Sequence, residues 1–169
     1  MSDQAEGRPV AASAIREHIY KVFPNDMNSN ATVFGGMVMA TIDRISLVVA
    51  ERHSGRVCVT VSVDDIHFLA PARTGETLIF SASCNRAWGS SMEIGCRVKA
   101  EDSMSGEQRH IVSAYSTFVA LDDDHKPVTV RPVRPETDIE RRRYDEAALR
   151  RDARLKHAKA LEKLRGGQG

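Results

Sequence analysis

The stretch GGMVMATIDRISLVVAER, residues 35–52, decides the fold because it predicts a helix with almost no polar face until its end. We expect this helix to run about four turns, from Met37 to Arg52, and Gly55 is typical of a residue that stops a helix. A helix that is apolar on nearly every face is normally buried. Residues 37–52 are therefore expected to form the central helix of a domain.

The segments around this helix predict strands. Directly after it, the valines at 57, 59, 61 and 63 alternate with polar residues, which is the period of two of a strand. Further strands are expected at residues 15–23, 77–85, 92–100 and 109–121. One strand, a buried helix and then several strands indicate an α+β domain, in which an antiparallel sheet of five or six strands wraps one helix. Such a sheet leaves edge strands exposed, which favours pairing with a second subunit.

Composition limits the class of protein. The chain has 169 residues, of which 41% are hydrophobic and 28% charged, and this favours one globular domain with at most one appended element. A net charge of +1 gives no overall attraction to nucleic acid or to an anionic membrane. The three cysteines show no C-x-x-C spacing, so neither a zinc site nor a disulfide framework is indicated. Without a long apolar run or a signal-peptide stretch, we expect a cytoplasmic protein with no membrane segment.

The chain divides into three expected parts. Residues 1–13 are predicted to be a flexible tail, residues 14–135 the domain, and residues 136–169 a charged helical tail capped by Thr137 or Asp138, with a disordered Gly-Gly-Gln-Gly end. Arginines in this tail alternate with Glu and Asp, which indicates a solvated helix rather than a nucleic-acid site. Its apolar stripe is narrow, so we expect it to lie on the surface or on a neighbouring subunit and to be dispensable for the activity of the domain.

Three motifs carry a resemblance to a known family. They are Asn28-x-Asn30-x-Thr32-x-Phe34-Gly35-Gly36, then Asp43, then Ser62-Val63-Asp64-x-Ile66-x-Phe68. Their order and spacing resemble the hotdog-fold acyl-CoA thioesterases, in particular the YciA-type bacterial enzymes and the brain-type cytosolic acyl-CoA hydrolases. The resemblance covers roughly residues 15–121. It implies the hotdog fold, hydrolysis of an acyl-CoA to a free acid and coenzyme A without a metal or redox cofactor, and a homo-oligomer, either a dimer or a trimer of dimers.

Asp43 is the sharpest single clue to chemistry. Its helical neighbours at three and four residues' distance are Met39, Ala40, Ser46 and Leu47, none of them charged. A buried carboxylate without a local cation must find a distant partner, raise its pKa, or act as a base or nucleophile. A structural acid paired with a distant arginine is the alternative. The resemblance implies the catalytic role.

Gly35 and Gly36 are candidates for an oxyanion hole. Their N–H groups would lie at the positive end of the helix dipole, where a thioester carbonyl develops negative charge. The alternative is that they only permit a tight turn into the helix.

The loop before the glycines contributes Asn28, Asn30 and Thr32, which we expect to orient water or the thioester by hydrogen bonds. Asx-turn and N-cap chemistry is the alternative for this loop, and for Asn30 in particular. Asn28 matches the family's loop asparagine. The sequence departs from the family at Thr32 and Phe34, where many relatives carry Asp or Asn and His, and this places more of the chemistry on Asp43.

For the nucleotide end of coenzyme A, the candidates are Arg73, Arg86, Ser90 and Ser91, with solvated turns as the alternative. No metal site is expected, because the acidic pair at 64–65 lacks ligands at suitable spacing apart from the nearby His67. Two other functions remain open. One is a non-catalytic acyl-CoA-binding or regulatory module on the same fold; the other is a hotdog hydratase, which would need a histidine beside the acid.

Overall fold

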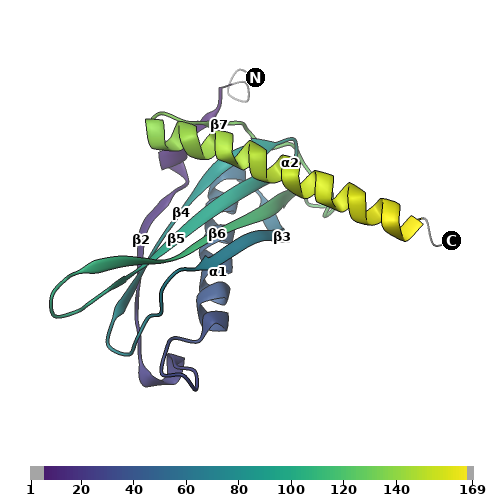
Figure 1. Ribbon diagram of the computed structural model, residues 1–169. Helices are drawn as coiled ribbons and strands as arrows, with labels where there is room; N and C mark the ends of the chain where they lie inside the picture. Colours follow the sequence, from purple (N-terminus) through teal and green to yellow (C-terminus); the bar gives the residue numbers. More distant parts are fainter. Residues whose placement is uncertain (1–5, 167–169) are drawn as a thin grey trace.

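The computed structural model describes residues 6–166 and has one main sheet with a helix on each face (Figure 1). The five strands are antiparallel and lie in the order β2-β4-β5-β6-β3. α1 (Gly35–Ser54) packs on one face and α2 (Asp138–Gly166) crosses the other. The strands are β2 (Ile15–Lys21), β3 (Val57–Phe68), β4 (Thr77–Trp88), β5 (Ser91–Glu101) and β6 (Gln108–Leu121). The predicted α+β hotdog architecture is confirmed.

The core lies between α1 and the sheet. One face of α1 presents Val38, Ile42, Ile45 and Val49, at a spacing of three or four residues that puts them in one row. The matching strand residues alternate with period two, as in Leu78 and its buried neighbours Phe80, Ala82 and Cys84. Gly55, in the left-handed region with φ 68°, ends α1 as predicted.

The expectation that α1 is buried on nearly every side is wrong for the single chain. Its far side exposes Met39, Asp43 and Val48, because one curved sheet covers only one side of a helix. Strand β3, at the edge of the sheet, also exposes large apolar side chains: Val57, Val59, Val61 and Val63. Two apolar surfaces without partners therefore lie at this edge of the molecule.

The predicted flexible tail differs from the structure at residues 8–13. Residues 8 and 9 form β1 (Arg8–Pro9), which pairs in parallel with β7 (Val133–Arg134), and the 3₁₀ turn η1 (Val10–Ala12) follows. Val10 and Ser13 are buried. A two-residue strand has too few positions for a periodic pattern, so periodicity could not predict it. Residues 1–5 lie outside the described part, and the three-part division of the chain stays a prediction.

α2 begins and ends close to its predicted bounds. The Thr137 hydroxyl accepts the Glu140 N–H at 3.2 Å, while the Glu140 carboxylate accepts the N–H groups of Glu136 and Thr137. This is a capping box, which satisfies the first backbone donors of the helix. The end predicted to be disordered falls mostly on residues 167–169, which lie outside the described residues.

Buried ion pairs, together with the apolar contacts of Tyr144 and the fully buried Ala147, attach α2 to the sheet. Arg150 donates to Glu93 at 2.7 Å, and the Glu93 side chain is only 2% exposed. One turn further on, Arg154 donates to both Asp64 and Thr117. Beyond Leu155 the helix is exposed and extends past the sheet (Figure 1).

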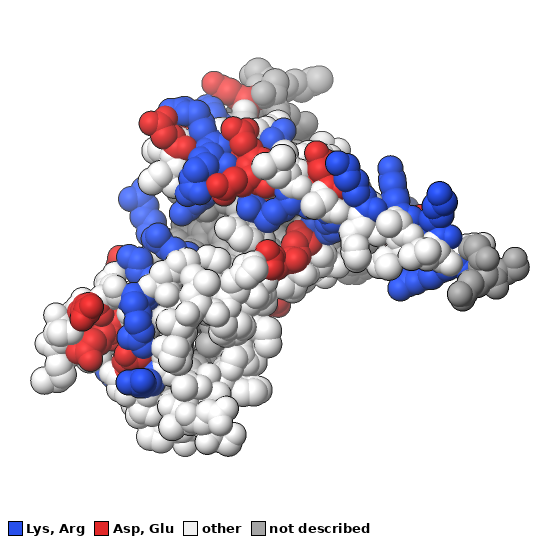
Figure 2. Space-filling model, viewed as in Figure 1, with Lys and Arg blue, Asp and Glu red and all other residues white. Residues whose placement is uncertain are grey.

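Charge is distributed unevenly on the face that α2 crosses. Figure 2 shows charged side chains gathered along α2 and a largely uncharged surface below it.

Of the described residues, no helix combines the length and the apolar character that a bilayer span requires.

Candidate active site

The loop before α1 is organised around the Asn28 side chain. Its carbonyl oxygen accepts the N–H groups of Asn30 at 2.8 Å and Thr32 at 3.2 Å, and its amide nitrogen donates to the Thr32 hydroxyl at 2.9 Å. The Asx-turn chemistry considered for this loop is therefore present. The amide nitrogen of Asn28 has two N–H groups, and this geometry uses one of them within the loop.

The two glycines form the first turn of α1, so the helix begins at Gly35 rather than at Met37. The Phe34 carbonyl accepts the Met37 N–H at 3.0 Å, which leaves the N–H groups of Gly35 and Gly36 without an acceptor inside the helix. A Cβ on Gly36 would collide with the Phe34 ring, and one on Gly35 would lie 3.3 Å from the Phe68 ring. The glycines thus make a tight turn and also present backbone donors.

The structure brings Asn28, Thr32 and Gly35 together at one pocket of about 420 Å³. Its other walls are largely apolar and come from α1, from the end of β3 and from β6, with Phe68, Leu69, Ile111 and Val112 among them. A few polar groups in an apolar cavity of this size are typical of a small-molecule site. We refer to it below as the loop pocket.

Asp43 lies away from this pocket, on the exposed side of α1. Its carboxylate accepts a hydrogen bond from the Thr60 hydroxyl of β3 at 2.8 Å. The expected burial of Asp43 is wrong for the single chain, for the same reason that the far side of α1 is exposed. Sequence reasoning missed Thr60. The alternation of residues 57–64 could have indicated it, because that pattern puts Thr60 on the same side of the strand as Cys58, which is buried.

The spacing along α1 separates the two groups of residues. Asp43 follows Gly35 by eight residues, which is about 12 Å along a helix axis. Within one chain the carboxylate is therefore well separated from the glycine N–H groups. The chain carries the Asn28–Gly35 group and the Asp43–Thr60 group as two separate parts, and the second lies at the unpaired β3 edge.

The residues proposed for coenzyme A lie at both ends of β4. Arg73 precedes the strand, where its N–H donates to Glu76 at 2.8 Å. Arg86 lies near the other end, between the rings of Trp88 and Tyr144, and donates to the Tyr144 carbonyl. Ser90 lies in the following turn and Ser91 is the first residue of β5, where its hydroxyl donates to the Trp88 carbonyl. One chain does not bring Arg73 to the other three.

The acidic pair at 64–65 has other partners than a metal. Asp65 pairs with His67 at 2.7 Å. Asp64 instead faces α2, where its carboxylate accepts hydrogen bonds from Ser62, Thr117 and Arg154. Burial alone would raise the pKa of Asp64, but these hydrogen bonds outweigh it and hold that pKa below its usual value. Within residues 6–166, no group of three or more His, Cys, Asp or Glu is placed to hold a metal ion.

The sequence matches known proteins over most of its length. Residues 30–107 match the family model described as Thioesterase superfamily. The chain is 38% identical over 149 residues to YkhA of Bacillus subtilis, an uncharacterized acyl-CoA thioester hydrolase, and the match covers 86% of this chain and 87% of that protein. It is 33% identical over 141 residues to the acetyl-coenzyme A thioesterase of Mus musculus, but spans only 25% of that longer protein.

Solved structures show the same architecture. An acyl-CoA hydrolase from Staphylococcus aureus, solved in complex with butyryl coenzyme A, coenzyme A and coenzyme A disulfide, has a TM-score of 0.85 and 36% identity, covering 94% of this chain and 99% of that one. The same hydrolase has been solved with an aspartate, a threonine or an asparagine replaced by alanine. A hexameric acyl-CoA thioesterase has a TM-score of 0.88 and 33% identity, covering 90% of this chain and 97% of that one.

Proposed function

The chain belongs to the hotdog-fold acyl-CoA thioesterases of the Thioesterase superfamily, and we propose that it hydrolyses an acyl-CoA thioester to a free carboxylic acid and coenzyme A. The observation that carries this proposal is that one chain holds two separate groups of candidate catalytic residues, neither of which is a complete active site by itself. Asn28 and Gly35 line the loop pocket, and Asp43 with Thr60 lies about two helical turns away. An aspartate, a threonine and an asparagine are also the residue types that were replaced in the Staphylococcus aureus hydrolase.

We place the active site between two subunits. The exposed valines of β3 and the exposed side of α1 meet at the Asp43–Thr60 contact, so a second copy packed on this edge would bring its own loop pocket to Asp43. The functional dimer is therefore the smallest complete unit in this proposal. A trimer of such dimers is the proposed assembly, supported by the hexameric thioesterase of the same fold.

In the proposed reaction, the thioester carbonyl lies against the N–H groups of Gly35 and Gly36. These donors, at the positive end of α1, stabilise the negative charge that develops on the carbonyl oxygen. Asp43 takes a proton from the attacking water, or attacks the carbonyl carbon itself, and Asn28 of the opposing subunit holds the water or the thioester. The carbon–sulfur bond breaks, and the thiolate leaves and is protonated. Where Asp43 attacks directly, the product of this step is an anhydride, and water then hydrolyses it to release the acid and regenerate the carboxylate. This chemistry requires no metal and no redox cofactor.

Two hydroxyl groups position the reacting side chains. Thr60 donates to the Asp43 carboxylate and fixes its orientation, while Thr32 accepts one N–H of the Asn28 amide and fixes that amide. The other amide N–H of Asn28 is then available to donate to a ligand in the loop pocket.

The nucleotide end of coenzyme A is proposed to lie across subunits as well. Arg73 lies at one end of β4, and Arg86, Ser90 and Ser91 at the other, so one ligand reaches both groups only if they come from different chains.

Two experiments test the proposal. The first measures thiol release from a panel of acyl-CoA substrates; coenzyme A bound without thiol release from any of them would indicate a non-catalytic binding module instead. The second mixes the Asp43→Asn and Asn28→Ala variants, each expected to be nearly inactive alone. If the site spans two subunits, random mixing restores about a quarter of the wild-type rate, because half of the dimers are mixed and each has one intact site. No recovery after verified subunit exchange would place both residues in one chain's site.

A further inference from the structure

The Gly35 N–H, one of the two proposed oxyanion donors, belongs to the peptide unit that joins Phe34 to Gly35. The carbonyl of this unit accepts the Met37 N–H at 3.0 Å inside the first turn of α1. Because the C=O and N–H groups of a trans peptide point in opposite directions, the Gly35 N–H points out of the helix. The exact direction of this donor therefore depends on how the Phe34 backbone is held.

Asp26 holds the Phe34 backbone. The Asp26 carbonyl accepts the Phe34 N–H at 2.7 Å, which joins the two ends of the loop directly. The preceding N–H group, that of Val33, donates to the Ala72 carbonyl at 2.8 Å. Two successive N–H groups thus bind acceptors in two different segments of the chain. The bond to Asp26 is the one next to the peptide that carries the Gly35 donor.

The carboxylate of Asp26 fixes its own backbone. Asp26 is the last residue of the 3₁₀ turn η2 (Pro24–Asp26). One of its carboxylate oxygens accepts the Phe23 N–H at 2.8 Å, and the other accepts the Tyr20 hydroxyl at 2.7 Å. Hydrogen bonds to a charged acceptor are stronger than those between neutral groups. Asp26 does not line the loop pocket, so its carboxylate is placed to hold the loop rather than to contact a ligand.

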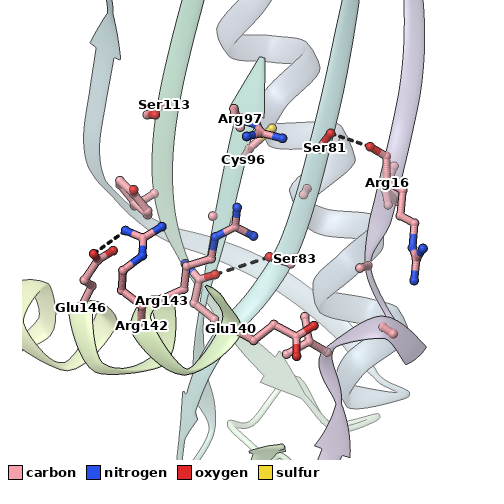
Figure 3. A pocket seen from close by; sticks show the side chains of 18 of the residues that line it. Arg16, Ser81, Ser83, Cys96, Arg97, Ser113, Glu140, Arg142, Arg143 and Glu146 are labelled. Atoms are coloured by element: carbon pink, nitrogen blue, oxygen red, sulfur yellow. Dashed lines mark hydrogen bonds and ion pairs between the residues drawn. The ribbon is translucent and has the colours of Figure 1, made fainter. Parts of the chain in front are cut away.

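Tyr20 connects Asp26 to the sheet. In β2 it pairs with Leu78 of β4, which is fully buried, and its side chain packs against the core. Earlier in β2, the Ser81 hydroxyl of β4 donates to the Arg16 carbonyl (Figure 3). The hydrogen bond to Asp26 raises the pKa of the Tyr20 phenol, which therefore stays protonated and able to donate at neutral pH.

We propose that Asp26 is a positioning residue of the oxyanion hole, held by Tyr20 and acting through the Phe34 backbone on the Gly35 N–H. This inference rests on the proposed hydrolysis and adds residues outside the loop pocket to it. An oxyanion donor must meet the position that the oxygen occupies in the transition state. A displacement of about 1 Å in an active site can cost about 100-fold in rate. Loosening Asp26 should therefore lower kcat while leaving the binding of acyl-CoA largely unchanged.

The kinetic test compares two substitutions of Asp26 in the full-length protein. Asp26→Ala removes both acceptors and should lower kcat about 10- to 100-fold, with KM for acyl-CoA changed by less than about 3-fold. Asp26→Asn should keep kcat within about 3-fold of the wild type, because an amide can accept the Phe23 N–H and donate to the Tyr20 oxygen. Tyr20→Phe removes one of the two bonds and should lower kcat about 3- to 10-fold.

Asp122→Ala is the matched control. The Asp122 carboxylate also accepts two hydrogen bonds, from the N–H groups of Asp124 and Lys126, but in the turn after β6. This turn is about 30 Å along the strand from Val112, which lines the loop pocket. Asp122→Ala should lower the melting temperature about as much as Asp26→Ala and leave kcat unchanged. All variants are assayed at a temperature at which thermal unfolding shows them to be folded.

Hydrogen exchange gives a readout that does not require hydrolysis. In the wild type, the N–H groups of Val33 and Phe34 are hydrogen-bonded and should exchange slowly. Asp26→Ala should speed exchange in residues 33–36 at least about 10-fold, because the end of the loop opens more often. Asp26→Asn and Asp122→Ala should leave it unchanged.

The outcomes separate this inference from the proposed function. If the wild type releases no thiol from any acyl-CoA, the proposed function fails, and exchange alone decides whether Asp26 fixes the loop. The positioning role is overturned if Asp26→Ala keeps kcat within about 3-fold of the wild type or if Asp26→Asn loses as much kcat as Asp26→Ala. It is also overturned if Asp122→Ala loses kcat equally, or if exchange in residues 33–36 is the same in Asp26→Ala and the wild type.

Discussion

α1 and α2 lie on opposite faces of the same sheet but are held there by different contacts. α1 buries a row of large apolar side chains, including Val38, Ile42 and Val49, each contributing about 1.5–3 kcal/mol by burial. α2 is exposed along most of its length, and Arg150 and Arg154 pair with carboxylates under it. The apolar contacts of α1 leave its other side available for Asp43, whereas the contacts of α2 use its charged side chains for attachment.

If α1 carries the chemistry, Asp43→Asn should have the largest effect on activity. Asn is nearly the same size, and the position is exposed, so the fold and coenzyme A binding are expected to persist. A base or nucleophile is lost, which costs on the order of 100- to 10,000-fold in kcat. Steady-state kinetics and coenzyme A calorimetry check this. Near-normal turnover would remove Asp43 from the mechanism, and equal losses of binding and turnover would make its role structural.

The attachment of α2 is tested by Arg150→Met. This change leaves the Glu93 carboxylate buried with only the Asn85 amide as a donor, and should lower the free energy of unfolding by about 3–5 kcal/mol. Arg142→Met is the control, since its ion pair with Glu146 is on the surface and is worth less than about 1 kcal/mol. Denaturant unfolding measures both. Equal effects of the two variants would mean that the buried pair does not hold the helix.

The difference between the apolar contacts of α1 and the ion pairs of α2 also explains which parts of the structure the sequence could predict. The central helix and the strands follow from apolar periodicity, which is a local property, and their positions were close to those observed. The partners of Asp64 and Glu93 could not be found this way, because Arg154 and Arg150 lie 90 and 57 residues further along the chain. An ion pair between a helix and a strand that are distant in the sequence leaves no periodic signal.

The candidate site was predicted in part for a similar reason. The motif named Asn28, Gly35 and Asp43 as candidates, but it did not name Thr60, which donates to the Asp43 carboxylate. β3 has register shifts between Thr60 and Ser62 and again after Val63, which change the face that its side chains occupy. Simple alternation would put Thr60 and Asp64 on one face, whereas they contact α1 and α2 respectively.

Arg154→Met should have a smaller, pH-dependent effect on α2. Because the folded-state pKa of Asp64 is lowered, its stabilising contribution is fully present above the unfolded-state pKa and is lost as pH falls through the folded-state value. At neutral pH the variant is expected to cost about 1.5–3 kcal/mol, the value of a hydrogen bond to a charged group. This cost should begin to shrink below about pH 4, the pKa of an aspartate in the unfolded chain, and should be lost at the lower pH where Asp64 is protonated in the folded state. Unfolding followed across that range would show a constant difference if Asp64 were not the partner.

The smallest effect is expected from removing the end of α2. A chain ending after Leu155 keeps Arg150 and Arg154 on their carboxylates. Of the described residues it loses only the exposed helical positions 156–166, so its stability should change by less than about 0.5 kcal/mol. Cutting after Pro135 would instead leave Glu93 and Asp64 without their arginines, and should destabilise the fold although it removes none of the proposed catalytic residues. Unfolding and sedimentation of the two truncations compare them. If the chain ending after Leu155 already has a lower oligomeric state, the exposed Leu161 and Leu164 belong to a subunit interface. α2 then makes an apolar contact that the single chain does not show.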